Sequence, residues 1–235
     1  MLKRVHRMTL TMRILHWILA LSVATCLVTG IYIATPFLWH GPGIGPSDSQ
    51  VMGYTRFVHF AFALVLDVAF LIWFYLFFYS LQVPFIRNLR PVGQRAREAL
   101  QMLAHYFTLK NKPPTSTHTD PLNAYGFILI HSLVLFQMVT GFALMAPTFS
   151  NANSLLPVWP WILQVCEQVS VWVFGTIVAV RQIHHVVALL LLALAILHIY
   201  IQVWRENYWV EGHISVVVSG DKYIEEDVPG RERFG

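Results

Sequence analysis

Four histidines lie where two pairs of metal ligands could form inside a membrane. His184 and His198 belong to one apolar run, RQIHHVVALLLLALAILHIYIQVWR, and are 14 residues apart. At 100° and 1.5 Å per residue, both imidazoles project from one helix face and lie about 21 Å apart along its axis. A histidine inside a membrane segment is uncommon and indicates a functional site. His16 and His59 lie near the starts of two further apolar runs.

Depth in the membrane sorts the four histidines into two pairs. His59 and His184 fall at the outer level, and His16 and His198 fall at the inner level. Each pair can supply two axial nitrogens to one haem iron, and bis-histidine ligation leaves no open position for a substrate. The spacing therefore predicts an outer and an inner haem that carry electrons.

An arginine precedes three of these histidines by three residues, at Arg13, Arg56 and Arg181. The i, i+3 spacing places each arginine on the same helix face as its histidine, on the water side. Because arginine binds carboxylates through two charge-assisted hydrogen bonds, we expect these three residues to contact haem propionates. The alternative is that they are ordinary arginines that extend to the membrane surface.

Three glycines occupy the predicted haem levels. Gly30 follows His16 by 14 residues, the offset that also separates the two histidines of the last apolar run. Gly126 and Gly141 fall at the inner and outer levels of the third run. A residue without a side chain lets a flat macrocycle approach the helix closely, although glycine also mediates packing between membrane helices.

Composition defines the class of protein that carries these residues. The chain has 235 residues, of which 56% are hydrophobic and 12% charged, against about 25% charged in soluble domains. We predict an all-α membrane protein with a single cytochrome b domain over residues 1–235, in which a four-transmembrane-helix bundle encloses two haems. The expected spans are about 14–36, 55–81, 122–146 and 183–205, followed by a cytoplasmic tail, 206–235, with a β-prone stretch, ISVVV.

The two cysteines, Cys26 and Cys166, form no C-x-x-C motif, so covalent haem attachment and iron–sulfur ligation are disfavoured. The chain is not expected to bind nucleic acid.

The stretch 158–180 is ambiguous, because it is apolar but interrupted by polar residues. Pro157 and Pro160 mark its start, its tryptophans suit a membrane interface, and Arg181 leaves almost no loop before the last span. We predict an extra helix on the periplasmic surface between spans three and four. A fifth span is the alternative.

Basic residues set the predicted orientation. The N-terminal segment carries four lysines and arginines, the 82–121 segment six, and the stretch from Arg205 to the end four, so 14 of the 16 fall on one side. The positive-inside rule then places both termini in the cytoplasm.

Several stretches together resemble the b-type cytochrome subunit of membrane-bound nickel–iron hydrogenases. They are LTMRILHWILALSVATCLVTGIYI, MGYTRFVHF, VTGFAL and the H-x13-H of the last span, and the resemblance covers about residues 10–220. Formate dehydrogenase cytochrome b subunits are similar, less closely. The resemblance implies two haem b groups ligated by His16, His59, His184 and His198. It also implies that the chain lies in a bacterial inner membrane and anchors hydrogenase small and large subunits on the periplasmic side. Electrons from the iron–sulfur small subunit would pass through the chain to a membrane quinone, menaquinone or ubiquinone. The hydrogen chemistry would belong to the partner subunits, because this chain has no ligand set for nickel.

The resemblance also implies a quinone site near the inner haem. Related chains have polar amides in an N-P-x-x-Q-like stretch that opens span three, where this chain has Asp120-Pro121-Leu122-Asn123. Asp120 could donate a proton to a reduced quinone or cap the helix, as aspartate often does. Asn123, slightly inside the membrane, is the better quinone candidate.

Two polar residues lie nearer mid-membrane, Asp67 in span two and His131 in span three. A buried carboxylate is costly unless it is protonated or paired, so we expect these two side chains to be partners.

Two other functions are compatible with parts of the pattern. The same cytochrome could serve a formate dehydrogenase or a thiosulfate-type reductase. A metal-ion transporter, which is a different class of protein, would line one continuous path with its histidines. The division into two levels, with arginines outside them, favours haem instead.

Overall fold

The computed structural model describes most of the chain, with gaps between the helices. The described residues are 2–6, 8–37, 50–79, 93–108, 121–148, 158–209 and 213–225. Asp120, one of the two quinone-site candidates, lies outside them.

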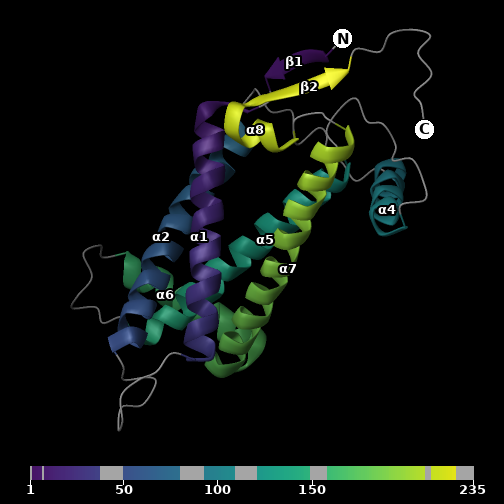
Figure 1. Ribbon diagram of the computed structural model, residues 1–235. Helices are drawn as coiled ribbons and strands as arrows, with labels where there is room; N and C mark the ends of the chain where they lie inside the picture. Colours follow the sequence, from purple (N-terminus) through teal and green to yellow (C-terminus); the bar gives the residue numbers. More distant parts are fainter. Residues whose placement is uncertain are drawn as a thin grey trace.

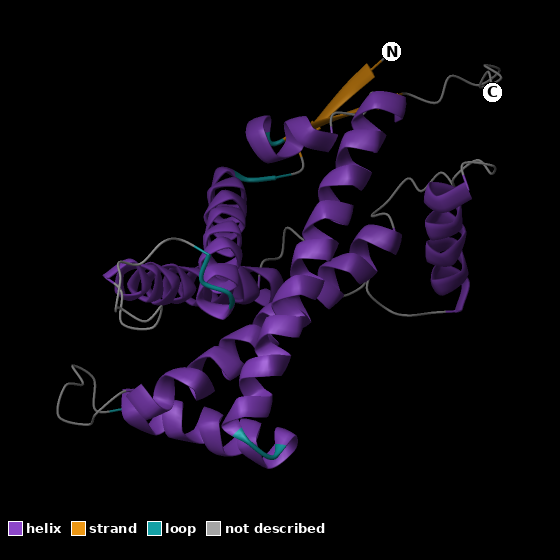
Figure 2. Ribbon diagram, turned by 60° about the horizontal axis from the view of Figure 1, so that its bottom comes forward, coloured by secondary structure: helices purple, strands orange, loops and turns teal. Residues whose placement is uncertain are grey.

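Four helices are long and apolar enough to cross a membrane, as predicted. Figure 2 shows that the described chain is almost entirely helical, with two strands at one end. The long helices begin and end within a few residues of the predicted spans, and the last one starts six residues earlier. They are α1 (Leu10–Ala34), α2 (Gln50–Tyr79), α5 (Pro121–Met145) and α7 (Ile177–Trp209).

The long helices associate in two pairs. Helix α1 packs along α2, α5 packs against α7, and contacts between α1 and α7 join the pairs. Both described ends of the chain lie at the same end of the bundle, as an even number of spans requires (Figure 1). Helix α7 diverges from α1 toward that end (Figure 1).

An apolar layer crosses the middle of the bundle. Phe70 of α2, Val134 of α5 and Leu191 of α7 are buried together. Leu191 lies seven residues from each histidine of α7, so this layer separates the two predicted haem levels. Partly buried aliphatic side chains from α1, α2 and α5 surround it, namely Leu19, Leu66, Ile130 and Leu133.

Two shorter helices flank the long ones. Helix α4 (Gly93–Thr108), which was not predicted, buries Ala99, Met102 and Tyr106 and packs against α5. Charged residues lie between these apolar residues in the sequence of α4. Such a pattern is typical of an amphipathic helix outside the hydrocarbon.

The ambiguous stretch between spans three and four forms a helix, α6 (Trp159–Phe174), whose place on the periplasmic surface stays a prediction. It follows α5 and a short 3₁₀ turn, η2 (Ala146–Thr148), and lies at the end of the bundle away from the termini (Figure 1). Gly175, with φ of 85°, ends α6 in a left-handed conformation before α7 begins. The ring of Trp159 meets Phe142 of α5 edge-on, with centroids 5.1 Å apart.

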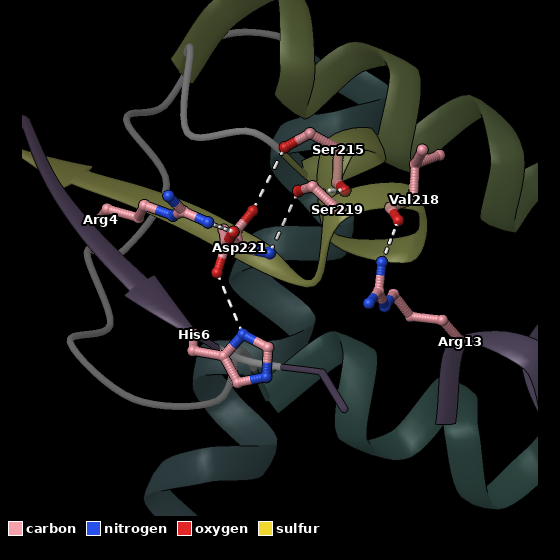
Figure 3. Close-up of polar contacts among 7 residues, drawn as sticks. All are labelled: Arg4, His6, Arg13, Ser215, Val218, Ser219 and Asp221. Atoms are coloured by element: carbon pink, nitrogen blue, oxygen red, sulfur yellow. Dashed lines mark hydrogen bonds and ion pairs between the residues drawn. The ribbon is translucent and has the colours of Figure 1, made fainter. Parts of the chain in front are cut away.

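The two ends of the chain form a terminal clasp, made of β1 (Leu2–His6), α8 (His213–Ser219) and β2 (Asp221–Glu225). The strands pair antiparallel, with Arg4 opposite Tyr223. Arg4 and His6 both bind the buried carboxylate of Asp221 (Figure 3).

The clasp corrects the expectation for the tail. ISVVV forms most of α8, and the strand begins after it. β-Branched residues favour strands only weakly, and here the environment outweighs that preference. The last carbonyls of a helix lack partners within the helix, and those of α8 accept hydrogen bonds from other groups. The carbonyl of Val217 accepts from the Trp17 indole at 3.0 Å, and the carbonyl of Val218 accepts from Arg13 (Figure 3). The carbonyl of Val216 accepts from the backbone N–H of Gly220 at 3.0 Å.

Candidate functional site

The structure brings His59 of α2 and His184 of α7 near each other at one level. A threonine from a neighbouring helix holds each ring. Oγ1 of Thr29, on α1, lies 2.9 Å from Nδ1 of His59. Oγ1 of Thr140, on α5, lies 2.8 Å from Nδ1 of His184. In both rings Nδ1 is thus engaged by protein, and no hydrogen bond to Nε2 is seen among the described residues.

The backbone of each outer histidine is also held from the neighbouring helix. The side-chain amide of Gln137 donates to the carbonyl of His184 at 2.8 Å. The thiol of Cys26 lies 3.8 Å from the carbonyl of His59, as a weak donor. Cys26 and Cys166 are both free, so no disulfide competes for this thiol.

Two of the predicted glycines lie beside these rings. A Cβ on Gly30 would be 3.3 Å from Cε1 of His59, and a Cβ on Gly141 would be 3.6 Å from Cε1 of His184. These glycines therefore give space to the imidazoles themselves. At Gly126 a Cβ would meet no described atom within 4 Å.

At the other end of the bundle, His16 of α1 lies near His198 of α7. The indole of Trp17 stands perpendicular to the His16 ring, with centroids 5.7 Å apart. Nδ1 of His16 is buried and has no hydrogen-bond partner among the described residues. His198 is exposed, on the part of α7 that diverges from α1.

The donor set fits haem. Each level holds two histidine imidazoles from different helices, which is a set of axial ligands that a six-coordinate haem iron can take. A ligating histidine usually donates its second ring N–H to an oxygen, as His59 and His184 can do here. The unpaired nitrogen of His16 is consistent with an imidazole whose partner is not part of the polypeptide. Within the described ranges, no three His, Cys, Asp or Glu side chains gather into a group that could hold a bare metal ion.

The three predicted propionate contacts differ in their surroundings. Arg13 donates to the carbonyl of Val218 in the terminal clasp, and its Nε is buried without a partner in the described chain. Arg56 and Arg181 are exposed near the outer ends of α2 and α7. Their role toward propionates stays a prediction.

His131 has other neighbours than the predicted Asp67. Its Nδ1 lies 2.8 Å from the carbonyl of Phe127 in its own helix. Its ring stacks on Phe127 and meets Phe70 and Trp73 of α2, with centroids 5.8 and 6.1 Å away. Aromatic contacts thus connect spans two and three at this depth, while Asp67 is buried in α2.

The threonines are the site residues that the histidine pattern did not reveal. A signal was present in the sequence: CLVTG at 26–30 and QMVTG at 137–141 both end in V-T-G after a side chain that can donate a hydrogen bond. Each stretch contacts an outer histidine through its first, fourth and fifth residues.

Known proteins similar to this chain match most of its length. A protein of Rhodobacter capsulatus named "Probable Ni/Fe-hydrogenase B-type cytochrome subunit" is 28% identical over 92% of this chain and 80% of its own length. One of the same name from Azotobacter vinelandii is 28% identical over 93% of this chain and 88% of its own length. The "Probable Ni/Fe-hydrogenase 1 B-type cytochrome subunit" of Escherichia coli (strain K12) is 24% identical over 88% of this chain and 86% of its own length.

These relatives confirm the resemblance predicted from the sequence. The sequence model of the family described as "Prokaryotic cytochrome b561" matches residues 7–220. That match includes all four long helices, which make this a multi-pass membrane protein, and both levels of paired histidines. Because the match covers most of the chain, the chain belongs to the prokaryotic cytochrome b561 family.

Proposed function

We propose that this chain is the membrane cytochrome b subunit of a nickel–iron hydrogenase. It anchors the small and large subunits on the periplasmic side and transfers electrons from the iron–sulfur small subunit to quinone. The observation that carries this proposal is the arrangement of two imidazole pairs at two depths of one four-helix bundle. The name shared by relatives that cover most of the chain supports the identity of the partner.

Membership of a b-type cytochrome family implies haem b, and the imidazole pairs support two such groups. His59 and His184 bind the outer haem, and His16 and His198 bind the inner one. Haem supplies one-electron transfer when it is bound. The apolar layer around Leu191 keeps water out of the space between the two levels.

The distribution of basic residues supports the orientation. The end of the bundle that carries both termini is cytoplasmic, in the bacterial inner membrane, because 14 of 16 lysines and arginines belong to the sequence before α1, between α2 and α5, or from Arg205 onward. Helix α6 is then periplasmic and helps to dock the small subunit. Its side chains Trp161 and Trp172, which are 63% and 85% exposed, suit such a contact.

The quinone, menaquinone or ubiquinone, binds near the inner haem, at the start of α5. Asn123 lies in the first turn of that helix, three residues before Gly126. The hydroxyl of Tyr125 is buried and has no hydrogen-bond partner among the described residues, which leaves it available to a quinone oxygen. Asp120, which precedes α5, is the proposed proton donor.

Single histidine variants test this order of electron transfer. The chain is produced in membranes with its native hydrogenase, and hydrogen-driven reduction of haem absorbance and of quinone is recorded. In His198→Ala, hydrogen still reduces the outer haem. Quinone reduction falls at least several-fold, because the inner haem has lost one of its two ligands. In His184→Ala, hydrogen reduces neither haem.

His185→Ala is the matched control, because His185 neighbours His184 but does not align with the ligand stripe. It should keep both haems and full quinone reduction. Normal quinone reduction in His198→Ala would contradict the proposed path through the inner haem.

A further inference from the structure

The outer histidines are held by two copies of one short structural unit. In each copy a polar side chain three residues before the threonine contacts the histidine carbonyl, and the glycine after it faces the ring. One copy lies on α1 and serves α2, and the other lies on α5 and serves α7. The threonine contacts with Nδ1 are nearly equal in length, at 2.9 Å for Thr29 and 2.8 Å for Thr140.

The direction of these hydrogen bonds follows from a second contact that each threonine makes. Oγ1 of Thr29 donates to the carbonyl of Thr25 at 2.7 Å, and Oγ1 of Thr140 donates to the carbonyl of Phe136 at 2.9 Å. A hydroxyl has one proton, so after this donation it can only accept from the imidazole. Nδ1 of each outer histidine therefore carries the ring proton.

The consequence concerns the opposite ring nitrogen. With the proton on Nδ1, Nε2 is an unprotonated donor that can bind iron, and the threonine fixes both the tautomer and the ring orientation. An acceptor on Nδ1–H also makes the imidazole a stronger electron donor to the metal. Stronger donation stabilises the oxidised iron and lowers its reduction potential.

The inner pair lacks this arrangement in at least one of its members. Nδ1 of His16 has no hydrogen-bond partner within the described part of the chain. Among the described residues, a protein acceptor at Nδ1 of both ligands is therefore a feature of the outer level.

We propose that Thr29 and Thr140 are positioning residues that set the ligand tautomer and lower the reduction potential of the outer haem. This inference rests on the proposed di-haem function. It assigns a role to two hydroxyl groups that contact neither substrate nor iron, and it explains the repeated V-T-G of α1 and α5.

Redox titration of the purified full chain tests the proposal, with optical spectra for potentials and low-temperature electron paramagnetic resonance for ligand geometry. Thr29→Val and Thr140→Val keep the side-chain shape but remove the acceptor. Each should shift the midpoint potential of the outer haem upward, change its resonance signal and leave the inner haem unchanged. The double variant should shift it further, and the serine variants should restore it. Loss of the outer haem in the valine but not the serine variants would support the same role.

Thr25→Val is the matched control, because among the described residues the Thr25 hydroxyl donates only to the carbonyl of Leu21. The substitution keeps the backbone carbonyl of Thr25, which accepts from Thr29. It should leave both potentials unchanged. Unchanged potentials in the valine variants, or equal effects of valine and serine, would overturn the inference. If the wild type still held two haems, the proposed function would stand. A wild type without two haems would instead contradict the proposed function.

Discussion

At the scale of the residue, the outer imidazoles depend on contacts that come from neighbouring helices. The hydroxyl of Thr140 and the amide of Gln137 hold the ring and the carbonyl of His184. The histidines could be predicted because polar rings are rare in apolar runs. The threonines could not be predicted in the same way, because a threonine in a membrane helix commonly bonds only to its own backbone.

Gly30 should be more sensitive to substitution than Gly141. In Gly30→Ala the new methyl group lies 3.3 Å from Cε1 of His59, a tighter contact than the 3.6 Å expected between Gly141→Ala and His184. The tight contact pushes the imidazole off its preferred rotamer, at a cost of about 1 kcal/mol. We expect Gly30→Ala to lower outer-haem occupancy several-fold, measured as haem per purified chain.

Gly141→Ala is the matched control and should retain nearly full occupancy. Equal losses in the two variants would show that the contact distance at the ring does not decide occupancy.

At the scale of the element, the four spans could be predicted because apolar length is a strong signal. Helix α4 and the terminal clasp could not. The apolar residues of α4 form no continuous run in the sequence, because charged residues such as Arg97 and Glu98 lie beside them. The clasp joins residues more than 200 positions apart, and its strands become strands only when they pair.

The terminal clasp should open in acid. Hydrogen bonding from Arg4, and then from His6, lowers the pKa of the Asp221 carboxyl below its usual value. The charged carboxylate therefore stabilises the clasp above the ordinary aspartate pKa of about 3.9, and this contribution is lost as the pH falls through the lowered pKa. Amide hydrogen exchange in residues 2–6, corrected for intrinsic rates, should rise several-fold below that point.

Asp221→Asn removes the charge at any pH and should raise the same exchange rates at pH 6. Amides in the middle of α2 serve as the internal control and should not change. Protection of residues 2–6 that is independent of both the pH and the substitution would contradict a role for this carboxylate.

At the scale of the whole molecule, the bundle places two imidazole pairs on either side of a shared apolar layer. Helix α7 contributes to both pairs and to the layer, through His184, Leu191 and His198. The 14-residue spacing that puts both histidines on one face of α7 could be predicted from the sequence alone. The way in which α1 and α5 brace the outer level could not, because it depends on which helices become neighbours.

The measurement that tests this account most directly is the haem content of the purified chain. Pyridine haemochrome analysis, together with the reduced-minus-oxidised spectrum, gives both the type and the number of haems. The account predicts two low-spin b-type haems per chain. One haem per chain would show that one histidine pair is not a ligand set, and a folded chain without haem would contradict the account as a whole.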